Sequence, residues 1–199
     1  MTDATKDPAA PPLAAYALWL VPSNSQQNQQ IQDVINELSS LEHPSPIFVP
    51  HITLIHPIPL STRLNDIHKT LKEAISATIN NTAKSDAEVL KVELNKAEKG
   101  SKYYQCILAP INKNNDRLLE LRKQVEEKFD IGNLPEYFPH LSLLYGNLRE
   151  KRKDELVDIA QSKLDQLNGI NSLEVNEVVI VSCVGTAEKW EIVGRERLN

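Results

Sequence analysis

Hydrophobic side chains recur along the chain in two rhythms, one typical of strands and one typical of helices. Short apolar or alternating runs predict strands at 16–21, 48–56, 89–94, 103–109, 138–145, 173–183 and 189–197. Apolar residues spaced three and four apart predict helices at 25–41, 61–80, 114–130 and 149–167. The pattern therefore predicts an α+β fold in which strands and helices alternate.

The predicted elements follow the same order, β-α-β-α-β, in both halves of the chain, and corresponding elements lie about 84 to 89 positions apart. We therefore expect one bilobal, duplicated domain at 14–199, with halves at about 14–97 and 102–199 and a linker near 97–101. Two antiparallel sheets would face each other across a central cleft with helices outside, and strands could be exchanged between the lobes. The polar residues 1–13 are expected to form a disordered lead-in.

The middle strand of each half carries the strongest part of the repeat. The run FVPHITLIH, which contains His51, matches the run YFPHLSLLY, which contains His140, in residue type at each position. Because side chains on a strand alternate between its faces, His51 shares a face with Thr53, and His140 shares a face with Ser142. The repeat therefore predicts two imidazoles and two hydroxyls in one cleft.

Two histidines at one site suit the cleavage of a phosphodiester. A neutral imidazole takes a proton from the attacking water, and an imidazolium protonates the departing sugar oxygen. Thr53 and Ser142 would donate hydrogen bonds to the non-bridging phosphate oxygens. The sequence has neither an acidic cluster suited to magnesium nor the histidine spacing of a zinc site, so we expect no metal and no cofactor. The pseudo-symmetry leaves open which histidine is the base.

The charge of the chain bears on the size of the ligand. The formal net charge is −5, whereas a protein that binds long nucleic acid normally carries a basic surface. A small anionic ligand in a local pocket is therefore favoured over long nucleic acid. No apolar run reaches the ~20 residues of a transmembrane helix. Cys106 and Cys183 lie in apolar runs, as reduced, buried cysteines do. We expect an intracellular, cytoplasmic monomer.

These motifs resemble those of the 2H phosphoesterase superfamily, which is named for its two histidine motifs. More closely, the chain resembles the plant and fungal cyclic phosphodiesterases. The resemblance is carried by ALWLVP at 17–22, FVPHIT at 48–53, YQC at 104–106 and PHLSLLY at 139–145. It extends to the last predicted strand, which holds Trp190, and so covers nearly all of the chain beyond the first dozen residues.

The resemblance implies an activity and roles for particular residues. The implied substrates are ADP-ribose 1″,2″-cyclic phosphate, a by-product of tRNA splicing that is opened to the 1″-phosphate, and nucleoside 2′,3′-cyclic phosphates, opened to 2′-phosphates. His51 and His140 match the catalytic pair, and Thr53 and Ser142 match the phosphate-binding hydroxyls. Tyr145 matches a further substrate contact, although five residues from His140 is the wrong parity for a regular strand. Golgi association is implied only by fungal members.

Other aromatic and imidazole side chains have two open interpretations. Trp19 lies on the cleft-facing side of its predicted strand, where it would either stack on a base or pack in the core. Tyr104 has the same two interpretations. His56 is equivalent to Tyr145 by the repeat and shares its unfavourable parity. Trp190 is expected in the core.

Two rival functions stand beside hydrolysis of a small cyclic phosphate. One is a 2H-type enzyme that trims or joins RNA ends, for which a basic groove would be expected. The other is a catalytically inactive nucleotide-binding module. The net charge of −5 argues against the first, and the intact residues of both motifs argue against the second.

Overall fold

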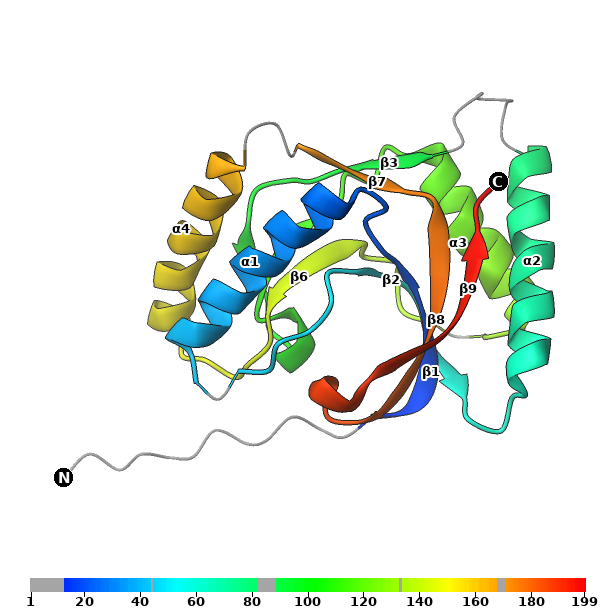
Figure 1. The fold of residues 1–199 in the computed structure, drawn as a ribbon, viewed down its shortest axis with the longest axis horizontal. Helices are drawn as coiled ribbons and strands as arrows, with labels where there is room; N and C mark the ends of the chain where they lie inside the picture. The colour runs from blue at the N-terminus through cyan, green and yellow to red at the C-terminus, as the bar shows by residue number, and fades with distance from the viewer. Residues whose placement is uncertain (1–12, 44, 82–88, 133, 168–170) are drawn as a thin grey trace.

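The computed structural model describes residues 13–43, 45–81, 89–132, 134–167 and 171–199, and the lead-in expected up to residue 13 lies almost entirely outside them (Figure 1). The helices in these ranges are α1 (Ser25–Leu41), α2 (Leu64–Asn81), α3 (Asp116–Phe129) and α4 (Glu150–Gln166). The strands are β1 (Leu13–Leu20), β2 (Ile52–Pro59), β3 (Leu90–Glu93), β4 (Glu98–Lys99), β5 (Ile107–Pro110), β6 (His140–Leu144), β7 (Ser172–Val175), β8 (Glu177–Gly185) and β9 (Glu191–Arg197).

The helices match the predicted segments because their ends are marked in the sequence. Helix α1 has the predicted bounds, and its first turn is capped by Asn24, whose side chain accepts hydrogen bonds from the amides of Gln26 and Gln27. Helix α3 begins after Asn115, whose side chain accepts from the amide of Leu118. The apolar stripe of each helix is buried, as the periodicity predicts.

Three predicted segments differ from the structure. Residues 103–105 form a 3₁₀ turn, so the strand predicted at 103–109 begins only at Ile107. The segment predicted as one strand at 173–183 is interrupted at Asn176, and its two parts, β7 and β8, join different sheets. The predicted linker at 97–101 contains β4, which pairs with β5. Each difference arises from a change of backbone direction that the apolar pattern does not record.

The α+β class with antiparallel strands is confirmed. One sheet has the order β4-β5-β6-β2-β1-β8-β9, and β3 pairs with β7 in a second, two-stranded sheet. The two motif strands, β2 and β6, are neighbours in the large sheet and meet through one residue pair, Ile52 with Leu141. The two facing sheets that we predicted are therefore joined along this seam, because the motif strands approach closely enough to share backbone hydrogen bonds.

The two sequence halves are interleaved in space. Strands β8 and β9 of the second half extend the part of the sheet that contains β1, and β3 of the first half pairs with β7 of the second. Helices α1 and α4 pack near β6, and α2 and α3 pack against each other at the other end of the sheet (Figure 1). The predicted exchange of strands is confirmed. None of the described helices has the length and apolar character needed to cross a membrane.

The main core lies between the sheet and the helices. Leu18, Leu20 and Leu54 point into it with the apolar stripes of the helices. Ala17, Trp19 and Cys183 belong to a separate, smaller cluster. The alternation along β1 therefore gives the sheet one face toward the helices and one face toward a different environment.

We expect Gly100→Ala to destabilise the fold. A Cβ atom at Gly100 would lie 1.9 Å from the carbonyl oxygen of Gln105, so the backbone of the turn would have to move. Overpacking of this kind costs about 1–3 kcal/mol. Chemical denaturation of both proteins measures the difference in the free energy of unfolding. The matched control is Gly132→Ala, where the added Cβ would contact nothing within 4 Å. Equal stabilities for the two variants would contradict this prediction.

Candidate active site

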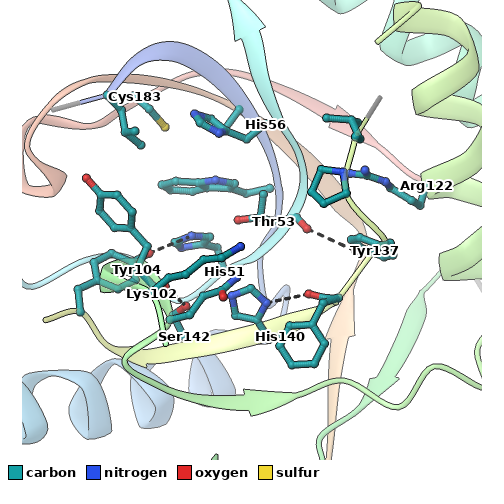
Figure 2. Close-up of a pocket in the computed structure, with 18 of the residues that line it drawn as sticks. His51, Thr53, His56, Lys102, Tyr104, Arg122, Tyr137, His140, Ser142 and Cys183 are labelled. Atoms are coloured by element: carbon teal, nitrogen blue, oxygen red, sulfur yellow. Dashed lines mark hydrogen bonds between the residues drawn. The ribbon is translucent and has the colours of Figure 1, made fainter. Parts of the chain in front are cut away.

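A cavity of about 360 Å³ lies on the sheet face that carries Trp19, away from the helices. Its volume falls within the roughly 300–1,000 Å³ typical of small-molecule sites. Each site residue expected from the sequence lines it, although these residues come from distant parts of the chain (Figure 2). The seven are Trp19, His51, Thr53, Tyr104, His140, Ser142 and Tyr145.

An extra residue in β2 changes which side chains face the cavity. Trp19 of β1 pairs with Thr53 of β2, whereas the neighbouring Leu18 pairs with Ile55. Two residues of β2 therefore correspond to one step along β1, which is a β-bulge. Leu54 and Ile55 are consecutive, yet both are fully buried in the main core. The bulge therefore resets the alternation, and His56 lines the cavity beside Thr53. In a regular strand, His56 would face away from the cavity; the bulge turns it toward the cavity.

Strand β6 has the same irregularity at the equivalent place. The consecutive residues Leu108 and Ile107 of β5 pair with Ser142 and Leu144, so Leu143 is the extra residue. Leu143 and Leu144 are both fully buried. Tyr145 thereby joins Ser142 in the cavity wall. Leu54 and Leu143 are 89 positions apart, the same separation as His51 and His140. The duplication thus extends to the backbone irregularity.

Each motif histidine is oriented by its own backbone. The Nδ1 atom of His51 lies 2.6 Å from the carbonyl oxygen of Val49, and that of His140 lies 2.8 Å from the carbonyl oxygen of Phe138. Since a carbonyl oxygen only accepts, Nδ1 carries the proton in both rings, and Nε2 is left to exchange protons. In Figure 2 the second ring nitrogen of His140 points away from this bond and into the pocket.

The two imidazoles differ in their surroundings. His51 is 5% exposed and stacks on Trp19, with ring centroids 3.6 Å apart and an angle of 12° between the planes. Burial lowers the pKa of His51 to about 4, with a smaller lowering from the charge of His140. His140 is less buried, and burial again lowers its pKa, while the bond to Phe138 opposes this change. Both imidazoles are therefore neutral at pH 7 in the free protein.

Tyr145 and Ser142 are both engaged in the unliganded site. The Tyr145 hydroxyl lies 3.4 Å from Nε2 of His51 and donates to its lone pair, and its ring stacks on Phe48 at 3.7 Å. The Ser142 hydroxyl is buried and donates to the carbonyl oxygen of Tyr104 at 2.9 Å. Ser142 therefore has to release this bond before it can donate to a phosphate.

Arg122 and Tyr137 support the β2 bulge, and neither was among the site residues expected from the sequence. The guanidinium of Arg122 is buried, donates to the carbonyl oxygen of Leu54, and lies 4.7 Å from the centre of the Tyr137 ring. The Tyr137 hydroxyl donates to the carbonyl oxygen of Thr53 at 3.3 Å (Figure 2). The backbone that carries Thr53 is thus held from α3 and from the segment before β6. The repeat aligns Tyr137 with Phe48, which has no hydroxyl, so the alignment of the two runs does not reveal the bond that Tyr137 makes.

The remaining walls are aromatic or charged. Trp190 lines the cavity, and the centre of its ring lies 5.9 Å from that of Trp19 and 5.5 Å from that of Tyr104. It therefore belongs to the site as well as to the core. Lys102 and Glu136 also line the cavity. Cys183 reaches it as well, and within the described part of the chain both cysteines are free and buried, as predicted. Among the same residues, no three metal-ligating side chains converge on one point.

The described fold is similar to that of bacterial phosphoesterases whose structures are solved. An E. coli LigT structure without ligand covers 94% of this chain and 98% of its own, with 12% identity and a TM-score of 0.52. A second structure, described as a phosphoesterase, has a TM-score of 0.54 and 11% identity over 95% of this chain. The chain therefore shares the overall fold of these solved structures.

The family itself is shown by the sequence. The family model described as "Cyclic phosphodiesterase-like protein" matches residues 14–198, and the chain belongs to this family. A 2′,3′-cyclic-nucleotide 3′-phosphodiesterase of Kluyveromyces lactis is 26% identical and covers 89% of this chain and 95% of its own. A cyclic phosphodiesterase of Arabidopsis thaliana is 25% identical and covers 92% and 95%. The resemblance to the plant and fungal proteins is thereby confirmed.

We expect Trp19→Ala to lower kcat and not only to raise KM. Trp19 is 4% exposed and one face of its indole is covered by His51, so its removal frees the imidazole to move. A displacement of about 1 Å in a catalytic group can cost about 100-fold in rate. Steady-state kinetics of Trp19→Ala and Trp19→Phe would show a 10- to 100-fold loss of kcat in the first and partial recovery in the second. A rise in KM alone would instead make Trp19 a stacking surface for the base.

Proposed function

We propose that this protein hydrolyses small cyclic phosphates, with His51 and His140 as the pair that transfers protons. The observation that carries the proposal is the equivalent placement of the two imidazoles in one cavity, each with Nδ1 bonded to its own backbone. Membership of the cyclic phosphodiesterase-like family supports the reaction class. The relatives named 2′,3′-cyclic-nucleotide 3′-phosphodiesterase support a nucleotide substrate.

The reaction needs one neutral imidazole and one imidazolium. The neutral ring takes a proton from water as the water oxygen bonds to phosphorus. The imidazolium gives its proton to the sugar oxygen as the bond from that oxygen to phosphorus breaks. A nucleoside 2′,3′-cyclic phosphate would yield a 2′-phosphate and a free 3′-hydroxyl. The hydroxyls of Thr53 and Ser142 bind the non-bridging oxygens, and Tyr145 adds a third hydroxyl to the site.

Substrate binding and protonation support each other at this site. Burial favours the neutral form of both rings in the free protein. A phosphate anion placed between them favours the charged form, because an opposite charge nearby stabilises an imidazolium. The site therefore acquires the proton that it needs when the anionic substrate is bound.

We infer small substrates from the size of the cavity. About 360 Å³ suits a mononucleotide, whereas ADP-ribose 1″,2″-cyclic phosphate would leave part of its length outside. The latter, with its link to tRNA splicing, remains part of the proposal through the family resemblance. The solved E. coli LigT has also been crystallised with 3′-AMP, a ligand of mononucleotide size.

We expect His51→Ala and His140→Ala each to lower kcat by ~10²–10⁴-fold on a nucleoside 2′,3′-cyclic phosphate, the usual range for positioned acid–base groups. The double variant should be little worse, because groups that act as a unit are not additive. The pH profile of kcat/KM for the unaltered protein should be bell-shaped. Its maximum should lie below pH 6.5, because burial lowers the pKa of both imidazoles from that value.

The assays are run with EDTA, so that full activity also tests the absence of a metal requirement. His43→Ala is the control, because His43 is exposed and does not line the cavity. Near-normal turnover in either motif variant would refute the two-histidine scheme, and a dependence on added divalent ions would refute the metal-free mechanism.

A separate expectation concerns polynucleotides. With a net charge of −5 and a cavity of about 360 Å³, the protein should not prefer an RNA bearing a 2′,3′-cyclic end over the cyclic mononucleotide. We would compare kcat/KM for the two substrates at 50 and at about 200 mM salt, a range over which several phosphate contacts would cost about 10³-fold or more. A strong, salt-sensitive preference for the RNA would favour the RNA-end enzyme over our proposal.

A further inference from the structure

Among the residues that the structure describes, one permanent cation of the cavity has no carboxylate partner. Lys102 lines the cavity with His51, His140 and Ser142, and Figure 2 shows its side chain extending among them. No ion pair or hydrogen bond of its ammonium group is recorded among the described residues. The charge of Lys102 is nevertheless close enough to His140 to contribute to the lowering of its pKa, after the larger effect of burial.

The other charges around the cavity are already neutralised. Arg122 is paired with the carboxylate of Glu126 and spends a further donor on the carbonyl of Leu54. Glu136 accepts from the ammonium of Lys113 at 3.0 Å, outside the cavity. An anion that enters the cavity therefore meets one uncompensated positive charge, that of Lys102.

The turn that carries Lys102 is held from several directions. The Gly100 amide donates to the carbonyl of Cys106 at 3.0 Å. The carbonyl oxygen of Gln105 lies so close to Gly100 that no side chain would fit there. The buried ammonium of Lys153 donates to the carbonyl of Gly100 at 2.9 Å. These hydrogen bonds hold the turn, and with it the backbone position from which the Lys102 side chain extends.

Strand β6 also binds this turn, on both sides of its bulge. The hydroxyl of Ser142 donates to the carbonyl of Tyr104, and the amide of Gly146 donates to the carbonyl of Tyr103, each at 2.9 Å. The backbone next to Lys102 is thus tied to the strand that carries His140. The backbone from which the Lys102 side chain extends is therefore held at a fixed place relative to that strand.

The chemistry of the site calls for such a charge. A cyclic phosphate diester carries one negative charge, and attack by deprotonated water adds a second. Thr53 and Ser142 are neutral donors, and the Ser142 proton is engaged with Tyr104 in the free site. A hydrogen bond from a charged donor is roughly twice as strong as one between neutral groups. A cation at the place where charge develops is therefore the group that the two motifs do not supply.

We propose that Lys102 binds the non-bridging oxygens of the substrate phosphate and stabilises the negative charge that develops in the transition state. This role rests on the proposed function of the same cavity. Lys102 transfers no proton in the reaction, because the two histidines perform both transfers. It acts as a fixed positive charge beside His140.

Kinetics of Lys102→Met and Lys102→Arg test this role. We expect Lys102→Met to lower kcat/KM by ~10²–10³-fold, the usual cost of losing one donor to developing charge. Lys102→Arg should stay within about tenfold of the unaltered protein, because it keeps the charge. Lys96→Met is the matched control, since Lys96 is an exposed lysine six residues earlier that does not line this cavity. A Lys102→Met variant within about threefold of the control would overturn the proposal, as would an equal loss in Lys102→Arg.

The pH profile adds a readout that a merely structural lysine would not move. Removing the charge of Lys102 should raise the pKa of His140, so the maximum of kcat/KM should shift to higher pH in Lys102→Met. The other charged or titratable side chains of the cavity walls are unchanged in this variant; they are His51, His56, Tyr104, Arg122, Glu136, Tyr137, Tyr145 and Cys183. An unshifted profile would contradict a position beside His140.

Direct binding separates this proposal from the proposed function. Calorimetry with adenosine 2′-monophosphate should show at least tenfold weaker binding to Lys102→Met and unchanged binding to Lys96→Met. This result is independent of turnover, so an inactive protein that still shows it would refute the hydrolase and keep the anion site. If adenosine 2′,5′-bisphosphate loses affinity in Lys102→Met and adenosine 2′-monophosphate does not, Lys102 binds a second phosphate and the proposal is wrong.

Discussion

The alternation of side chains along a strand is the constraint on which this site depends. A regular strand could present only every second residue to the cavity. In each motif, the histidine and the hydroxyl would then face the cavity, but the ring three residues after the hydroxyl, His56 or Tyr145, would face away from it. One extra residue, Leu54 in β2 and Leu143 in β6, lifts this restriction and sends two consecutive aliphatic side chains into the same core. The insertion is tolerated because the core gains a buried side chain while the cavity gains Tyr145 and His56. Arg122 then binds the carbonyl that the bulge exposes at Leu54.

The second physical theme is desolvation. The imidazole of His51 lies between aromatic rings, with Trp19 against its face and Phe48 at its edge, and this removes it from water. Such an environment disfavours the charged form of the imidazole, and burial accordingly lowers the pKa of His51. Lys102 differs from these buried rings, because it is exposed to solvent while still lining the cavity.

Much of the site could be predicted because its signal is local and repeated. The Pro-His-x-hydroxyl order appears twice, and the period of two places His51 with Thr53 and His140 with Ser142 in any strand model. The bulges could not be predicted, since two adjacent aliphatic residues are equally consistent with a buried strand. Lys102 lies just before the strand predicted at 103–109, whose first residues form a 3₁₀ turn, and no sequence motif marks it. The seam between β2 and β6 depends on contacts between distant segments, which local patterns do not encode.

The pairing of β1 has a consequence for how the protein is made. Strand β1 contains the first described residues, and one of its two neighbours, β8, reaches Gly185, near the end of the chain. During synthesis, β1 can pair with β2 soon after both have been made, but it can pair with β8 only after all the residues between them have been translated. Contacts of such long range slow folding and leave an unpaired edge open to association with other chains. A nascent chain of this protein is therefore expected to need protection, by a chaperone or by the ribosome surface, until β8 closes the sheet.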